Sequence, residues 1–253
     1  MEVGAKTLET YPKEENQHNK PSVSILLPAH NEAGTIQETI LEFYNEIATK
    51  IPVEIIVSED GSTDGTKEAL VELSEKIPIK LILDEKRKGY MKGVKDGLKL
   101  SNSEFVFFSD SDGQHVASDF WKLYEKRNDY DLLVGKKIKR VDPPHRIFIS
   151  KVFHLLVQLL FGLPIRDPDT AYRLIRREVV KDVADEAHIL KYSFWTEFTV
   201  RAFKKGFKVA EVPVVHRQRL QGNTRLYKSS KLFGIMTSQM IGLFRLWRML
   251  NKS

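Results

Sequence analysis

Acidic side chains gather in three short polar segments of this 253-residue chain: His30-Asn31-Glu32, Glu59-Asp60-Gly61-Ser62 and Asp110-Ser111-Asp112. In and after the third segment, Asp110, Asp112 and Gln114 alternate along the chain, so that they can face one ion. All three offer only oxygen ligands, which favour Mg²⁺ or Mn²⁺ over zinc. Such an ion suits a diphosphate, because it bridges the oxygens and neutralises the charge that grows on a leaving nucleotide. The pattern predicts a divalent-metal site.

Each segment alone would be typical of a turn, because Asp-Gly and Ser-Asp pairs are common turn formers. However, each directly follows a short apolar run that predicts a buried strand: Val23–Leu27, Val53–Val57 and Phe105–Phe108. Parallel strands bring their carboxyl ends to one edge of a sheet, and ligands of such sheets bind there. Three polar segments at three strand ends therefore predict one common site.

The same alternation of apolar runs and amphipathic stretches extends from Ser22 to Gly135. Runs that are apolar throughout indicate an α/β fold with a mostly parallel sheet that helices cover on both faces. The sequence predicts further strands at Ile79–Leu83, Leu132–Val134 and Val209–Val215, and helices around Ile36–Ile47, Ala69–Leu73, Met91–Leu98, Phe120–Tyr124 and Phe194–Lys205. Between them, Asp167-Pro168-Asp169 predicts a turn.

The overall charge is basic, with 40 Lys and Arg against 34 Asp and Glu. This balance is compatible with nucleic acid, anionic lipid or phosphorylated substrates. No basic patch with interleaved aromatic residues is evident, so nucleic acid is not an expected partner. The absence of cysteine excludes disulfides and thiolate metal ligands. Residues 1–20 are polar and lack a signal-peptide core, so we expect a disordered tail and a cytoplasmic protein.

Two later stretches are strongly apolar, Ile147–Phe161 and Leu232–Leu250. Neither offers the ~20 uninterrupted apolar residues that spanning a bilayer requires. Either is compatible with a buried core or dimer helix. Basic residues at their margins favour an amphipathic helix in the interface of an anionic membrane, above all for the second stretch. We therefore expect peripheral attachment to the cytoplasmic face of a membrane. The sequence does not decide whether the chain also forms a homo-oligomer.

Three segments, in this order, resemble the signature loops of the inverting family 2 glycosyltransferases: Leu26–Glu32, Glu59–Thr66 and Asp110–His115. Within that family the chain most resembles dolichyl- or polyprenyl-phosphate mannosyl- and glucosyltransferases, from Ser22 to about Lys228. The resemblance implies a GT-A (Rossmann-like) fold and Mg²⁺- or Mn²⁺-dependent transfer of a hexose from a GDP-mannose or UDP-glucose type of donor. It suggests a GT-A domain at residues 21–229, after the tail at 1–20, and a membrane-associating helix at 230–253.

The resemblance also implies roles for individual residues. The nucleotide-sugar donor would be held by Pro28, His30, Glu32 and Asp60, with Asp60 at the base and Glu32 at the ribose, and by Asp110 and Arg219. Arg219, with Gly222 and Thr224 near it, resembles a loop that closes over the donor phosphates. The metal ligands would be Asp110, Asp112 and Gln114. Arg146 and Ser150 would bind the acceptor phosphate, with Lys137 nearby. The expected catalytic residues are Asp112, Arg146 and Ser150.

Several positions depart from the family pattern. His30 stands where Tyr is frequent, Glu59 where Asp is usual, and Gly113 where Leu is common. The turn Gly89-Tyr90-Met91 lacks the usual second glycine. Lys137 replaces an expected Arg and loses its bidentate fork. These departures concern the identity of the base and the sugar more than the chemistry.

The expected acceptor depends on Trp195-Thr196-Glu197-Phe198. Many relatives that glycosylate a hydroxyl carry Thr-Glu-Asp here, and their Asp removes the proton. Phe198 occupies that Asp position, and a phosphate, largely ionised at neutral pH, needs no general base. Two alternatives stay open. In one, Glu197 or another carboxylate serves as base for a sugar or lipid hydroxyl. In the other, the chain is a non-catalytic, basic membrane-binding module, against which the intact Asp110 and Asp112 argue.

Overall fold

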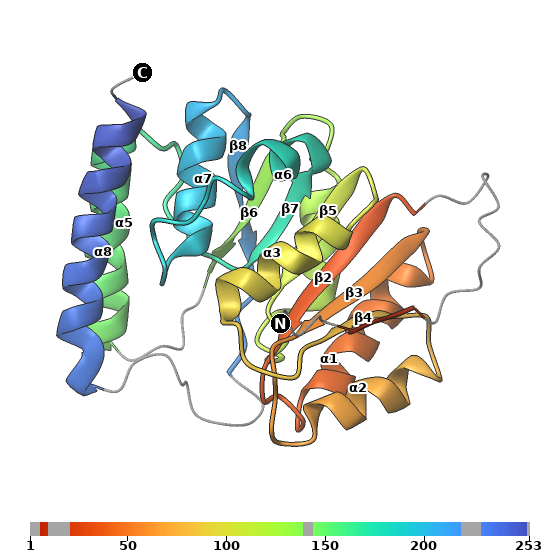
Figure 1. Cartoon of the computed structure of the whole chain (residues 1–253). Coiled ribbons are helices and arrows are strands. Elements are labelled where there is room, and N and C mark those ends of the chain that lie inside the picture. The colour runs from red at the N-terminus through yellow and green to blue at the C-terminus, as the bar shows by residue number, and fades with distance from the viewer. Residues whose placement is uncertain (1–5, 10–20, 139–143, 219–228, 252–253) are drawn as a thin grey trace.

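The computed structural model describes residues 6–9, 21–138, 144–218 and 229–251, and for 6–9, 144–146 and 229–233 it describes the backbone alone. Its strands form one sheet in the order β1-β4-β3-β2-β5-β7-β6-β8 (Figure 1). Their bounds are β1 Lys6–Glu9, β2 Val23–Ala29, β3 Val53–Glu59, β4 Lys80–Leu83, β5 Phe105–Ser109, β6 Leu132–Lys137, β7 Tyr172–Arg176 and β8 Val209–Val214.

Most neighbouring strands run parallel. The pairs β4–β3, β3–β2, β2–β5 and β6–β8 are parallel, whereas β1 and β7 run antiparallel to their neighbours. The carboxyl ends of β2, β3, β5, β6 and β8 therefore meet at one edge of the sheet, together with the beginning of β7. The expected α/β architecture with a mostly parallel sheet is confirmed.

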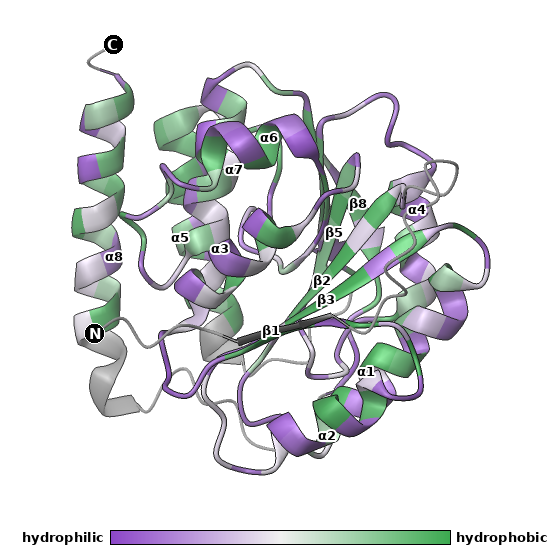
Figure 2. Ribbon diagram, turned by 45° about the vertical axis from the view of Figure 1, so that its right-hand side comes forward, coloured by the Kyte–Doolittle hydropathy of each residue, from purple (hydrophilic) through white to green (hydrophobic). Residues whose placement is uncertain are grey.

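Helices cover both faces of the sheet (Figures 1 and 2). One face carries α1 (Ile36–Phe43), which continues as the π-helical turn Tyr44–Ala48, α2 (Thr66–Ser74) and α4 (Phe120–Tyr124). The other carries α3 (Tyr90–Leu100), α6 (Arg177–Val183) and α7 (Phe194–Lys204). Strand β2 shows why its run is apolar throughout, since Ile25 and Leu27 join the first core and Leu26 joins the second.

The two strongly apolar helices lie side by side at one end of the molecule (Figure 1). They are α5 (Pro144–Phe161) and α8 (Ser229–Leu250). A third apolar core joins them to the rest of the fold, and its buried members include Val157, Phe161, Leu243 and Leu246. Among the described residues, no helix is both long enough and apolar enough to cross a bilayer.

Three features differ from the sequence-based expectation. The tail predicted at residues 1–20 is wrong for Lys6–Glu9, which form β1 and pair with the edge strand β4. That pairing uses backbone groups, so hydropathy gives no signal for it. The sequence also did not predict β7 or the short helix α6. Strand β7 carries Arg173 and Arg176, and charged residues hid its apolar pattern.

Candidate functional site

The three acidic segments converge at the carboxyl edge of the sheet, as the sequence predicts. Strand β2 lies between β3 and β5, so the loop after β2 is flanked by the loops after its two neighbours. The Asp60 N–H donates to the Ala29 carbonyl oxygen at 2.9 Å. On the other side, the Ser111 hydroxyl donates to the Pro28 carbonyl oxygen at 2.6 Å. The carboxyl end of β2 is thus hydrogen-bonded to the loops after both neighbouring strands.

Asn31 shapes the loop after β2. Its φ of 54° is left-handed, a conformation that Asn tolerates better than most residues. Its N–H donates to the Ser62 hydroxyl oxygen at 2.8 Å, and its Oδ1 accepts the Thr63 N–H at 2.8 Å. The next residue, Glu32, donates its N–H to Thr66 Oγ1 at 2.9 Å. This network places the half-buried Glu32 beside the loop after β3.

His30 lies against the backbone of Asp60. Its Nδ1 is 2.7 Å from the Asp60 carbonyl oxygen. A carbonyl oxygen only accepts, so Nδ1 carries the proton in this contact. Nε2 lies 3.3 Å from Asn31 Nδ2, which can donate to it. Both ring nitrogens are thereby satisfied within the protein, which leaves the faces of the imidazole ring for stacking on a base.

The Asp60 carboxylate holds the turn at residues 86–89 in place, a contact that the sequence did not predict. Asp60 is buried, and it accepts the N–H groups of Lys88 and Gly89, the latter at 2.9 Å. At the adjacent Gly61, a Cβ atom would lie 2.4 Å from the backbone nitrogen of Arg87, so only glycine fits this close approach. The Lys88 ammonium pairs with Asp84 and Asp96. Asp60 therefore fixes the 86–89 turn, and its contact with a base stays a prediction.

The loop after β5 is tied to the chain that follows β8. The Arg217 N–H donates to the Gln114 carbonyl oxygen at 2.7 Å, and Gln114 Nε2 donates to the Arg217 carbonyl oxygen at 3.2 Å. His115 and His216 pair beside them as an isolated antiparallel bridge. The amide nitrogen of Gln114 is used as a donor, and the amide oxygen, Oε1, is the side-chain atom that could coordinate a cation.

The electrostatics at Asp110 fit a divalent cation. Burial, together with the negative charge of Asp112, raises the pKa of Asp110 to about 7, and the positive charge of Lys137 opposes this shift. Two carboxylates that repel one another suit a shared cation. Among the described residues, no three His, Asp or Glu side chains gather as a metal cluster. The candidate ligands are therefore two carboxylates and one amide, and substrate oxygens would complete the coordination.

The structure adds residues to this edge that the sequence did not single out as site residues. Because β7 runs antiparallel, the segment before it lies at the same edge. Asp169 accepts the Thr196 hydroxyl at 3.0 Å and the Thr196 N–H at 3.3 Å. Burial, aided by Asp167, raises the pKa of Asp169 to about 6. The sequence showed only a turn there, since the position of Asp169 depends on the unpredicted β7.

Arg173 lies fully buried beneath this region. Its guanidinium donates to the carbonyl oxygens of Thr170 and Pro168 and stands 4.2 Å from the ring centroid of Trp195. Burial lowers its pKa to about 10, although Asp169 opposes the shift. At neutral pH, Arg173 therefore stays a cation that supports the backbone around Asp169.

The predicted acceptor residues are placed only in part. Lys137 ends β6, and its charge acts on Asp110. Arg146 and Ser150 lie one helical turn apart near the beginning of α5, which starts at Pro144. The Arg146 side chain is not among those described. Arg219, Gly222 and Thr224 lie outside the described residues.

Neither Glu197 nor Phe198 is placed to act as a base. Phe198 is completely buried in the core under α7. Glu197 is 1% exposed; its Oε2 accepts the N–H groups of Ile189 and Leu190, and its Oε1 accepts Arg201 Nε–H at 2.8 Å. Glu197 thus forms a buried structural ion pair, which weakens the alternative that it removes a proton from an acceptor.

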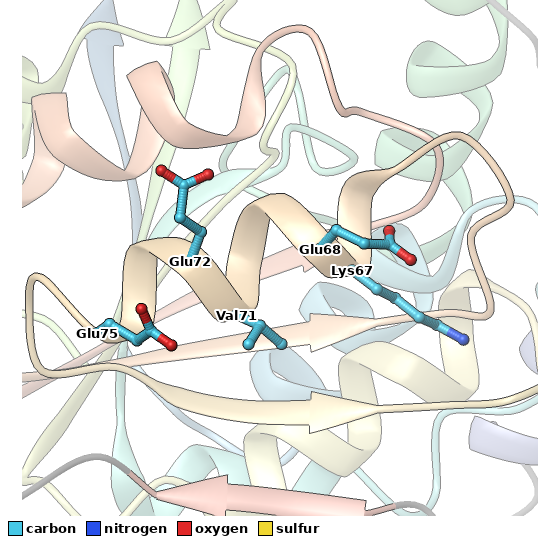
Figure 3. A pocket seen from close by; sticks show the side chains of 5 residues that line it. All are labelled: Lys67, Glu68, Val71, Glu72 and Glu75. Carbon is cyan, nitrogen blue, oxygen red and sulfur yellow. The ribbon is translucent and has the colours of Figure 1, made fainter.

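A hollow on the surface of α2 lies apart from these residues (Figure 3). Its lining consists of Lys67, Glu68, Val71, Glu72 and Glu75. Three of these five side chains are acidic, and none belongs to the loops after β2, β3 or β5. Such a lining repels a diphosphate, so we place the candidate site at the carboxyl edge.

Comparisons with known proteins found a family model and several relatives that this chain resembles. The family model described as "Glycosyl transferase family 2" matches residues 24–184, which include all three acidic segments. A dolichyl-phosphate beta-glucosyltransferase of Dictyostelium discoideum is 28% identical over 80% of this chain and 72% of its own length. A dolichol-phosphate mannosyltransferase of Pyrococcus furiosus is 30% identical over 81% of this chain, but the match spans only 59% of that protein.

Solved structures share the fold. The mannosyltransferase PcManGT of Pyrobaculum calidifontis, in complex with GDP-Man and Mn²⁺, has a TM-score of 0.64 at 18% identity, over 89% of this chain and 64% of that one. Glucosyl-3-phosphoglycerate synthase of Mycobacterium tuberculosis, in complex with Mn²⁺, UDP and glucosyl-3-phosphoglycerate, has a TM-score of 0.65 at 18% identity, over 89% and 80%. At this identity the likeness concerns the fold alone.

Proposed function

The chain belongs to glycosyl transferase family 2, and on that premise we propose that it transfers a hexose from a nucleotide-sugar donor to a polyprenyl or dolichyl phosphate. The observation that carries the proposal is the convergence of the loops after β2, β3 and β5 around Asp110 and Asp112. The names of the two relatives support the acceptor, since both refer to dolichol phosphates.

On the donor side, each loop has a separate task. His30 would stack on the base, and Glu32 would accept the ribose hydroxyls from its place beside Thr66. Asp110, Asp112 and Gln114 would hold Mg²⁺ or Mn²⁺. When bound, the ion would supply positive charge that neutralises the diphosphate of the departing nucleotide. Arg219, which lies outside the described residues, would bind the same phosphates. A donor of the GDP-mannose or UDP-glucose type has the base, the ribose and the diphosphate that these residues would bind.

On the acceptor side, the residues supply positive charge. Lys137 lies near Asp110, and Arg146 and Ser150 lie in the first turns of α5. A phosphate at the beginning of a helix meets free backbone N–H groups and the positive end of the helix dipole. The phosphate oxygen would then attack the anomeric carbon of the sugar in line, with inversion, as the bond from that carbon to the nucleoside diphosphate breaks. No proton would need to be removed from the acceptor.

A second candidate function is transfer to a hydroxyl, and Asp169 is the observation that favours it. Its carboxylate lies at the site edge and has a pKa of about 6, raised mainly by burial. It would still be largely ionised at neutral pH, and it is a stronger base than an ordinary carboxylate. Asp169 would therefore take the role of base that Glu197 and Phe198 cannot fill.

The exposed sides of α5 and α8 support a peripheral position on a membrane. On α5, Phe148 is 68% exposed and Leu159 is 73% exposed. On α8, Ile241 and Phe244 are about half exposed, and Arg245 and Arg248 lie on the same helix. We name the exposed apolar side chains of these two helices the outer face: Phe148, Val152, Leu155, Leu159, Met236, Met240, Ile241, Phe244 and Met249. Apolar side chains with nearby arginines suit an anionic lipid surface.

Arg146→Ala is expected to weaken the use of polyprenyl phosphate by roughly ten- to a hundredfold, because a hydrogen bond to a charged group contributes about 1.5–3 kcal/mol. The shift of the thermal unfolding temperature by GDP or UDP with Mn²⁺ is expected to stay as in the parent protein. The measurements are kcat/KM for the acceptor and the thermal shift. Lys151→Ala, an exposed cation on the same helix, serves as the control. If Arg146→Ala leaves the acceptor dependence unchanged, the phosphate site is not at α5.

A further inference from the structure

Tyr90 connects the candidate metal site to the core beneath α7. It is the first residue of α3 and follows the turn at Gly89, whose φ of 96° favours glycine. Trp195 Nε1–H donates to the Tyr90 hydroxyl oxygen at 2.9 Å. The Tyr90 hydroxyl lies 3.3 Å from Asp110 Oδ1 and donates to it. The three residues come from segments far apart in the sequence.

The direction of these two hydrogen bonds is fixed by chemistry. An indole N–H can only donate, so the Tyr90 oxygen accepts from Trp195. The single hydroxyl proton of Tyr90 is then directed at the Asp110 carboxylate, which accepts. One oxygen of Asp110, Oδ1, is thereby engaged by the protein itself.

The indole of Trp195 is held firmly enough to orient Tyr90. Trp195 is 2% exposed. Its ring centroid lies 4.5 Å from that of Phe108 and 5.4 Å from that of Phe198, and the Arg173 guanidinium lies 4.2 Å from it. The Tyr90 ring also makes an edge contact with Phe108. Tight packing on several sides leaves the N–H one direction in which to point.

We propose that Tyr90, oriented by Trp195, is a positioning residue for the divalent cation: it engages Oδ1 of Asp110 and presents Oδ2 to the metal. This inference rests on the proposed function, since it assumes that Asp110 and Asp112 hold Mg²⁺ or Mn²⁺. The two carboxylates repel one another, and a hydroxyl bonded to Oδ1 keeps the Asp110 group from turning away. The proposal concerns metal affinity, and Tyr90 takes no part in bond breaking.

The test is a titration of the 253-residue chain with Mn²⁺ in the absence of substrate. Electron paramagnetic resonance measures the free Mn²⁺ at each point and so gives the dissociation constant. Tyr90→Phe is expected to raise the dissociation constant for Mn²⁺ about three- to tenfold, because it removes a hydrogen bond that orients Asp110 while the metal ligands themselves remain. Trp195→Phe is expected to act in the same direction. The double variant is expected to be no weaker than the weaker single variant, because both changes interrupt one chain of interactions.

Two control variants make the same chemical changes elsewhere. Trp121→Phe likewise removes an indole N–H; this one donates to Glu46 Oε1 at 2.8 Å, outside the site. Tyr192→Phe removes the hydroxyl of an exposed tyrosine. Both are expected to bind Mn²⁺ as the parent protein does. If Trp195→Phe does not fold, as judged by circular dichroism, the Mn²⁺ affinity of Tyr90→Phe alone decides whether Tyr90 positions Asp110.

Unchanged Mn²⁺ affinity in a folded Tyr90→Phe variant would overturn the proposal, and so would single effects that simply add in the double variant. Either result leaves the proposed function standing, provided that the parent protein binds Mn²⁺ and transfers the sugar. A parent protein that binds no Mn²⁺ and forms no product with the nucleotide sugars contradicts the proposed function instead, and this inference with it.

Discussion

Asp112→Asn is expected to abolish sugar transfer and to leave the fold intact. The side-chain oxygen of Asn can still accept the Gln114 N–H, which Asp112 Oδ1 now accepts at 3.2 Å. The substitution removes the negative charge that a divalent cation needs, and with it the neutralisation of the departing diphosphate. A loss of about a hundred- to a thousandfold or more in kcat is the expected scale for such transition-state stabilisation. The measurements are initial rates at saturating Mn²⁺ and a thermal unfolding curve.

Asp129→Asn is the matched control, because Asp129 is exposed in the turn after α4. It is expected to keep the parent activity. EDTA is expected to stop transfer by the parent protein, and excess Mn²⁺ is expected to restore it. Full transfer in EDTA would mean that the chemistry runs without a cation and that Asp110 and Asp112 have another task.

Phe148→Ser combined with Ile241→Ser is expected to release the protein from anionic vesicles. Full burial of one such side chain contributes about 1.5–3 kcal/mol, so the pair is expected to lower vesicle binding by roughly a hundredfold or more. Both side chains are largely exposed in the folded chain, at 68% and 49%, so the fold is expected to lose little stability. Co-sedimentation with vesicles of phosphatidylcholine and phosphatidylglycerol measures the effect. Val71→Ser, on the exposed side of α2, is the control.

Deletion of α8 would be a poorer test of the same claim. Leu243 and Leu246 are buried against the core that includes α5, and Gln239 donates to the Ser193 hydroxyl oxygen. Removal of the helix would expose that core and alter solubility for reasons unrelated to lipid. A different outcome is that the parent protein forms dimers in solution, and that the double serine variant is monomeric but still binds vesicles. The outer face would then be a contact between copies of this chain.

The sequence predicted the part of the site that depends on strand ends. Strands β2, β3 and β5 are apolar throughout because both faces of the sheet are covered, and this pattern alone is enough to locate the three acidic loops. In contrast, the contacts of Tyr90 and Asp169 join segments far apart in the sequence. The Trp195–Tyr90 bond spans 105 positions, and no periodicity signals such a contact.

Arg173 illustrates why the sequence pattern does not predict β7. A charged side chain within a strand normally indicates an exposed position. Arg173 is nevertheless fully buried, because backbone carbonyls of Pro168 and Thr170 and the Trp195 ring take up its guanidinium. For α5 and α8, the composition showed that the helices are apolar. It did not show which side packs against the fold and which side forms the outer face.

The most direct test of the proposed function is product formation from labelled GDP-mannose and UDP-glucose, with polyprenyl phosphate and with the matching polyprenol offered separately. A glycosylated lipid phosphate is expected from one of the two donors, and no product is expected from the alcohol. Asp169→Asn, which keeps an acceptor for the Thr196 hydroxyl, is expected to retain transfer to the phosphate. Equal activity on the alcohol, lost in Asp169→Asn, would contradict the proposed function and show that the protein glycosylates a hydroxyl.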